Sequence, residues 1–134
     1  MISRGMERAL HARMSPPFDL DERTFQFLCS VIGFVRTIRW EPGTNRIIEQ
    51  LVDAAGSIGA NRQEASSGSS RREFLRFSEI SLRSAKESRF WLRACAAAGL
   101  GDQQLCEPLI GEADQLVRIF AAIVLSTKNG PPTG

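Results

Sequence analysis

Hydrophobic residues recur every three or four positions in four successive segments of the chain, and no segment alternates as a half-buried β-strand does. The four segments span about residues 21–40, 44–65, 70–98 and 102–128, and short turns separate them. A short connection makes two amphipathic helices antiparallel neighbours, because their apolar faces must meet. The sequence therefore predicts an all-α protein with the architecture of an antiparallel up-down-up-down four-helix bundle.

Capping residues mark the predicted ends of these helices. Asp21 can cap the first helix, and Ser70 with Glu73 forms a capping box at the start of the third. Gly99 ends the third helix, and Asp102 begins the fourth. The bundle is therefore expected over residues 18–128.

The two ends of the chain are predicted to lie outside the bundle. Residues 1–17 form a basic leader that contains three arginines and ends in Pro-Pro, and residues 129–134 form a tail with a second Pro-Pro pair. Both are expected to be disordered. A start codon assigned too far upstream, with Met14 as the natural first residue, would also explain the leader, and a transit peptide is a further alternative.

Composition excludes several classes of chemistry. The single histidine, His11, precedes the predicted bundle, so neither a histidine-based metal centre nor a Ser-His-Asp triad is expected. The three cysteines are odd in number and lack CxxC spacing, which favours buried thiols in the reducing cytoplasm over disulfides or zinc. No apolar run approaches the roughly 20 residues that a membrane-spanning helix needs. We therefore expect a cytoplasmic protein with no cofactor, no metal and no membrane partner.

The first predicted helix carries an apolar surface that is wider than one bundle face requires. Its hydrophobic residues form two adjoining stripes, which together cover more than half of the helix circumference. One stripe contains Phe25, Leu28, Ile32 and Val35, and the other contains Phe27, Val31, Phe34 and Ile38. Such a helix is expected to contact a second copy of the chain. The predicted interface residues are Phe27, Phe34, Ile80 and Trp91, with core packing as an equal alternative for Trp91.

The net charge of +2 conceals an uneven distribution. Residues 62–93 include eight basic and four acidic residues, whereas residues 102–118 include one basic and four acidic residues. When the third helix is wound at 3.6 residues per turn, four of its basic residues fall within about 80° of one another. They are Arg72, Arg76, Arg83 and Lys86, and Arg71 lies beside them at the helix start. These five are candidates for binding the phosphates of RNA or DNA; a solvated helix face, with Glu79 paired to Arg83, is the alternative.

Three polar residues, Asn61, Glu64 and Glu87, are predicted to face inward and to form a structural hydrogen-bond network. A catalytic or ligand-binding role is the alternative, although di-iron bundles need Glu-x-x-His repeats, for which the predicted bundle has no histidine. Ser70 and Glu73 complete this set of structural polar residues through their capping role. The run of small residues from Gly56 to Ala60 predicts a close helix crossing, within one subunit or between two.

Several motifs, taken in order, resemble those of a bacterial family. They are Ser57-Ile58-Gly59-Ala60-Asn61, Ser70-Arg71-Arg72-Glu73-Phe74 and Glu87 to Leu92 (ESRFWL), within a resemblance that covers about residues 18–128. The family comprises four-helix-bundle proteins first recognised in intervening sequences of 23S ribosomal RNA genes. The resemblance implies a bundle that assembles into a ring, typically a pentamer, and it implies no enzymatic activity. The chain is also similar to the accessory variability determinant of diversity-generating retroelements, which implies a basic pentamer surface that works with a reverse transcriptase and nucleic acid.

These observations predict a non-enzymatic four-helix-bundle protein that forms a homo-oligomeric ring and binds RNA or DNA non-specifically, or assists a nucleic-acid enzyme. The alternative is a protein–protein interaction scaffold with no nucleic-acid role. A third hypothesis is an enzyme or small-molecule binder with a polar pocket at Asn61 and Glu64.

Overall fold

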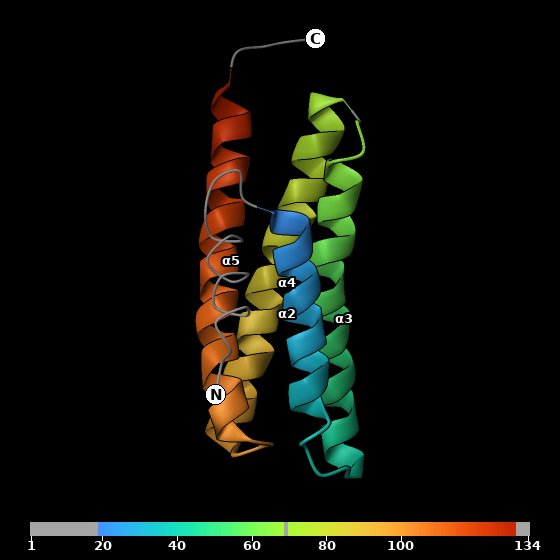
Figure 1. Ribbon diagram of the computed structural model, residues 1–134, viewed down its shortest axis with the longest axis vertical. Helices are drawn as coiled ribbons and strands as arrows, with labels where there is room; N and C mark the ends of the chain where they lie inside the picture. The colour runs from blue at the N-terminus through green and yellow to red at the C-terminus, as the bar shows by residue number, and fades with distance from the viewer. Residues whose placement is uncertain (1–18, 69, 131–134) are drawn as a thin grey trace, which may run out of the picture.

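Four helices run alternately up and down along one long axis (Figure 1). The structure is a computed structural model that describes residues 19–68 and 70–130. The helices are α2 (Leu20–Val35), α3 (Pro42–Ala65), α4 (Arg71–Ala98) and α5 (Gln103–Asn129). The described residues include no β-strand, so the prediction of an all-α, antiparallel four-helix bundle is confirmed.

The predicted chain ends fall largely outside the described residues. This is the case for the leader, residues 1–17, and for the last four residues of the tail, 131–134. Asn129, which the sequence places in the tail, is instead the last residue of α5. Within the described ranges, none of the four helices combines the length and the hydrophobicity that spanning a bilayer requires.

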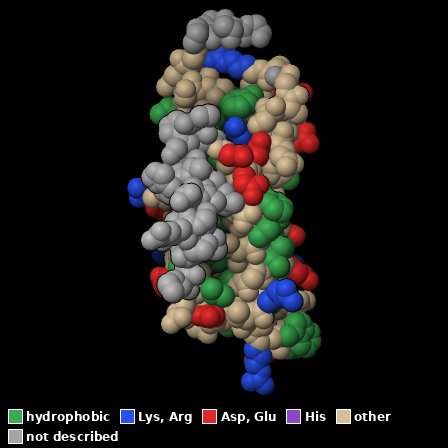
Figure 2. All heavy atoms as spheres, viewed as in Figure 1, with side chains coloured by type: hydrophobic (Ala, Val, Ile, Leu, Met, Phe, Trp, Pro, Cys, Tyr) green, Lys and Arg blue, Asp and Glu red, His purple; other side chains and the backbone are tan. Residues whose placement is uncertain are grey.

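The ends of α2 differ from the prediction. Its N-cap is Asp19, whose Oδ1 accepts the N–H of Glu22 at 3.0 Å, so the prediction that Asp21 caps this helix is wrong. Asp21 lies in the first turn instead, where its charge meets the positive end of the helix dipole. Figure 2 shows acidic side chains gathered near this start of α2. The helix ends at Val35 rather than near Trp40.

The predicted caps of α4 and α5 are confirmed. Ser70 Oγ accepts the N–H of Glu73 at 3.2 Å, and Asp102 Oδ1 accepts the N–H of Gln104 at 2.9 Å. Gly99 ends α4 with a φ of +68°, a left-handed conformation that glycine adopts without the steric cost of a side chain. Ser70 therefore sets where α4 begins, and Gly99 with Asp102 sets the turn between α4 and α5.

Buried side chains from all four helices form one hydrophobic core along the bundle axis. α2 and α5 contribute large side chains to it, whereas α4 contributes mainly small ones. The largest fully buried apolar side chains are Phe34, Phe120, Leu51, Ile58, Leu92 and Leu116. Four serines of α4 are also buried, namely Ser78, Ser81, Ser84 and Ser88.

The small side chains bring α4 close to the backbone of α3. Ser81 Oγ donates a hydrogen bond to the main-chain oxygen of Ile58 at 2.9 Å, so the side chain of one helix reaches the backbone of the other. α3 is also approached by α2, because a Cβ added at Gly59 would lie 3.1 Å from Oγ1 of Thr24. The close crossing predicted from the small-residue run is therefore confirmed, and it lies within one chain.

Candidate nucleic-acid interface

The exposed side of α4 is a basic surface. Ser70 caps this helix, and the serine and apolar positions that follow at helical spacing turn one side toward the core. The other side carries four of the five predicted basic residues, and all four are exposed. They are Arg72, Arg76, Arg83 and Lys86, here called the basic face. The helix rises about 21 Å from the first to the last of them, so positive charge lies in a row along one side of the bundle.

Acidic residues neutralise this row less than the sequence suggests. Glu79 lies between Arg76 and Arg83 along the helix, but its Oε2 pairs with Nζ of Lys128 from α5 at 3.6 Å. Arg83 makes no ion pair with any residue of the described ranges, so the predicted pairing of Glu79 with Arg83 is not present there. The guanidinium of Arg76 lies over the ring of Phe77 at 4.4 Å, which orients this cation without removing its charge.

Arg71 belongs to the bundle rather than to the basic face. Its Nη2 donates to the main-chain oxygens of Thr127 and Gly130, at 2.5 and 2.8 Å, where α5 ends. The last carbonyls of a helix have no partner within it, and a cation placed there meets the negative end of the helix dipole. This side chain joins the start of α4 to the end of α5, whereas the binding of nucleic acid by Arg71 stays a prediction.

The predicted inward polar network is not formed. Glu64 and Glu87 are exposed, and Nδ2 of Asn61 donates within its own helix, to the main-chain oxygen of Ser57 at 2.8 Å. The buried polar side chains are hydroxyls instead, and those of the described residues are Thr24, Thr44, Ser78, Ser81, Ser84 and Ser88. The sequence signal for them is the repetition of serine at core-facing positions of α4, since a buried hydroxyl needs a partner close by.

The interface residues predicted on α2 are also corrected. Phe27 and Phe34 lie in the core of the single chain, so neither side chain has surface left for a second copy. The adjoining stripe is exposed in part: Phe25 is 54% exposed, Ile32 is 39% exposed, and Cys29 is exposed between them, whereas Leu28 is half-buried and Val35 is buried. The three exposed residues are here called the α2 stripe. Figure 2 shows hydrophobic side chains at the surface on this side of the bundle.

One exposed aromatic residue, Phe90, extends the basic face toward the end of α4. It follows Arg72 by five helical turns, or about 18 residues, so both lie on the same side of the helix. Its ring is 61% exposed and meets the half-buried indole of Trp91 edge-on, with ring centroids 5.1 Å apart. Ile80 is half-buried as well, so Ile80 and Trp91, unlike the two phenylalanines of α2, keep part of their surface free. The five-turn spacing is the signal by which sequence reasoning could have found Phe90.

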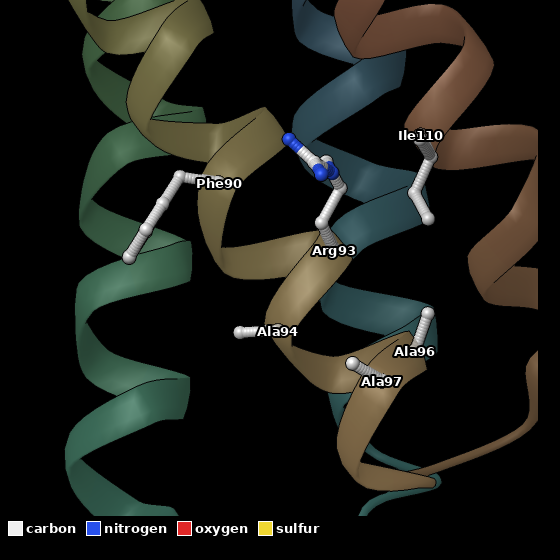
Figure 3. A pocket seen from close by; sticks show the side chains of 6 residues that line it. All are labelled: Phe90, Arg93, Ala94, Ala96, Ala97 and Ile110. Atoms are coloured by element: carbon white, nitrogen blue, oxygen red, sulfur yellow. The ribbon is translucent and has the colours of Figure 1, made fainter.

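The surface beside Phe90 is hollowed (Figure 3). A shallow groove of about 670 Å³ is lined by Phe90, Arg93, Ala94, Ala96, Ala97 and Ile110. Phe90 leans toward the side of α3, the side chain of Arg93 runs back along α4 toward its start, and the small alanine side chains lie further along α4 (Figure 3). The lining of the groove therefore combines an exposed aromatic ring, a cation and small apolar side chains.

The described residues offer little to acid–base or metal chemistry. In residues 19–68 and 70–130, no three His, Cys, Asp or Glu side chains lie close enough together to hold a metal ion. Burial raises the pKa of Cys95, and burial together with the nearby Cys95 and Glu107 raises the pKa of Cys106 to about 11. Both thiols stay protonated near neutral pH, and a protonated thiol is a poor nucleophile.

Comparison with known proteins places the chain in a family. Its fold resembles the crystal structure of a protein of unknown function from the S23 ribosomal protein family of Bacteroides thetaiotaomicron, with a TM-score of 0.67 over 78% of this chain and 96% of that one. The two sequences are 19% identical, so this likeness concerns the fold alone. No curated protein matches the chain. The model of the 23S rRNA-intervening sequence proteins matches residues 19–122, which include α2, α3, α4 and most of α5, and the chain therefore belongs to this family.

Proposed function

We propose that the protein binds nucleic acid without sequence specificity through the basic face of α4, and that it has no enzymatic activity of its own. The observation that carries this proposal is the row of four exposed cationic side chains, none of which forms an ion pair with the described residues. Cations that neutralise phosphates release condensed counterions, and this release supplies affinity without reading the bases. If all four bind a duplex, log affinity should fall against log salt concentration with a slope of about −3.6.

The proposal includes self-association into a ring, with five copies as the family resemblance implies. Its support is the α2 stripe, because Phe25 and Ile32 expose apolar surface that α2 does not bury in its own bundle. A ring would repeat the basic face around its circumference and strengthen the field that attracts a polyanion. Such an assembly is suited to holding RNA or DNA for a nucleic-acid enzyme. The three cysteines are unpaired, which fits a reducing compartment such as the cytoplasm.

The test is fluorescence anisotropy with labelled RNA and DNA, measured from low to physiological salt. We expect the triple variant Arg72→Glu, Arg76→Glu, Arg83→Glu to lose binding. The matched control replaces three other exposed arginines by glutamate, near the turn between α2 and α3, and it should keep most of the affinity. These control residues are Arg36, Arg39 and Arg46. Equal loss in both triples would attribute binding to net charge, and no binding by the wild type at low salt would refute the proposal.

The alternative function is a protein–protein interaction scaffold without a nucleic-acid role. It is favoured by a second shallow groove of about 340 Å³ between α2 and α5, which is lined by Ser30, Gly33, Gln104, Leu105, Pro108 and Leu109. The basic face would then be a solvated surface only. Under this alternative, the triple variant of the basic face should capture the same protein partners as the wild type does.

A further inference from the structure

The groove beside Phe90 has the parts of a site that stacks a nucleic-acid base. Its aromatic wall is a ring that is 61% exposed, although an exposed phenylalanine adds nothing to the bundle core. The alanines that line the groove are small, and Ala94 lies one helical turn beyond Phe90, so no bulky side chain follows the ring at that position. Aromatic side chains of this kind bind bases of any sequence, because every base has a π-face.

We propose that this groove takes one base of a single-stranded nucleic acid, with Phe90 as the stacking platform. The inference rests on the proposed function and deepens it, because it names the single strand as the preferred ligand. A duplex keeps its bases stacked inside and offers none to the ring, whereas a single strand can turn a base outward. The basic face would bind the phosphates of both forms, and Phe90 would favour the single strand.

The positions of neighbouring cations fit a strand that runs along α4. Lys86 precedes Phe90 by one helical turn, or about 6 Å of rise, and Arg93 follows it by about 4.5 Å. A base held on the ring would therefore have two cations of α4 within about one helical turn of Phe90. Trp91 meets the Phe90 ring edge-on at 5.1 Å, which limits the orientations of the ring before a base arrives.

A second copy of the chain fits this groove less well than a single strand does. Its best apolar surface is the α2 stripe, and seating that stripe here would bury the guanidinium of Arg93 against apolar side chains. Burying a charge without a partner is costly, whereas a phosphate supplies that partner. Charge complementarity therefore favours the nucleic acid as the occupant.

The experiment compares Phe90→Ala with the wild type by anisotropy, using a fluorescent single-stranded RNA and a duplex of the same length. Loss of one stacked base should weaken single-strand binding by about 5- to 150-fold and leave duplex binding unchanged. Phe90→Tyr should keep the wild-type preference, because it keeps a ring. Leu125→Ala is the matched control, since it removes an apolar side chain of α5 that is exposed to the same 61%, outside the basic face and the α2 stripe, and it should change neither affinity.

Two independent readouts accompany the affinities. In a Trp40→Phe background, Trp91 is the only tryptophan, and its fluorescence should be quenched when single-stranded RNA binds but not when the duplex binds. Light scattering on Phe90→Ala should give the wild-type mass. A changed mass together with unchanged single-strand affinity would assign Phe90 to a contact between copies and overturn the inference.

The failure of this inference can be distinguished from the failure of the proposed function. If the wild type binds single strand and duplex equally and Phe90→Ala has no effect on either, stacking is refuted while phosphate binding stands. If the wild type binds neither form at low salt, the proposed function fails and the inference fails with it.

Discussion

The guanidinium of Arg71 closes the C-terminal end of α5, where main-chain carbonyls have no partner within the helix. Two of these carbonyls, from Thr127 and Gly130, accept hydrogen bonds from the same nitrogen. The contact joins the first residue of α4 to the last turn of α5, and it is partly buried. A charged donor in this position stabilises the helix end through both hydrogen bonding and the helix dipole.

Replacing Arg71 by alanine should therefore destabilise the protein by about 1–3 kcal/mol, the range for hydrogen bonds made by a charged group. The measurement is the free energy of unfolding from urea titration, followed by circular dichroism. Arg72→Ala is the control, because it removes the neighbouring arginine from an exposed position, and it should change the stability by less than about 0.5 kcal/mol. Equal effects of the two substitutions would contradict the assignment of Arg71 to the bundle.

At the scale of the elements, the contact between α3 and α4 depends on buried serines. Ser81 Oγ reaches the backbone of α3, whereas Ser78 Oγ is buried and has no hydrogen-bond partner among the described residues. A hydroxyl that is buried without a partner loses its hydrogen bonds to water and forms none in the protein, so its burial destabilises the fold. Ser81 is therefore expected to stabilise the protein and Ser78 to destabilise it, although both lie on the same face of α4.

We expect Ser78→Ala to raise the stability of the protein and Ser81→Ala to lower it. Both substitutions gain the same helix propensity, so the difference between them isolates the hydrogen bond and should be about 1–2 kcal/mol. Urea titration of the two variants in parallel measures this difference. The account of the α3–α4 contact would be wrong if the two variants shifted the unfolding midpoint in the same direction by the same amount.

The order and type of the four helices can be predicted because each carries its own apolar period, and α4 and α5 begin at recognisable caps. The start of α2 is ambiguous, since Asp19 and Asp21 are both suitable acceptors two residues apart. The buried face of α2 is ambiguous as well, because its two apolar stripes adjoin. Phe27 is buried and Phe25 is exposed because of the positions of the neighbouring helices. The local sequence pattern of α2 carries no information about those positions.

The candidate site is predictable in the same partial way. The basic face needs only the helical period, so its four cations are found from sequence. The role of Arg71 depends on acceptors that lie 56 and 59 positions away in the chain, which periodicity within one helix cannot reveal. The inward network predicted for Glu64 and Glu87 does not form, and both carboxylates are exposed to water. An unpaired carboxylate has a lower free energy in water than in the core.

At the scale of the whole molecule, ion pairs between helices decide where charge remains. Glu112 of α5 accepts two hydrogen bonds from Arg23 of α2, at 2.7 and 2.8 Å. Asp114 pairs with Arg89 at 2.8 Å and with Arg118 at 3.1 Å. The acidic character that the sequence assigns to the last helix is thus partly cancelled within the chain. The basic face of α4 keeps its charge, and a ring would repeat this face rather than neutralise it.

Self-association through the α2 stripe can be measured by the reactivity of Cys29, the thiol within the stripe. Cys29 is exposed on the stripe, whereas Cys95 and Cys106 are buried and have raised pKa values, so iodoacetamide should label only Cys29 in the native protein. If copies meet through the stripe, the labelling rate of Cys29 should fall as the protein concentration rises. The fall should parallel a light-scattering mass that grows from 14.8 kDa toward that of a ring.

A matched pair of variants shows whether the stripe itself makes that contact. Phe25→Glu should keep the protein monomeric and Cys29 reactive at every concentration, because a buried unpaired carboxylate opposes the interface. Leu125→Glu, which places the same charge at an exposed leucine of α5, should assemble as the wild type does. If a ring forms while Cys29 is labelled as fast as in dilute protein, the copies meet through another surface. In that case the apolar surface of α2 would have to be explained by a different partner.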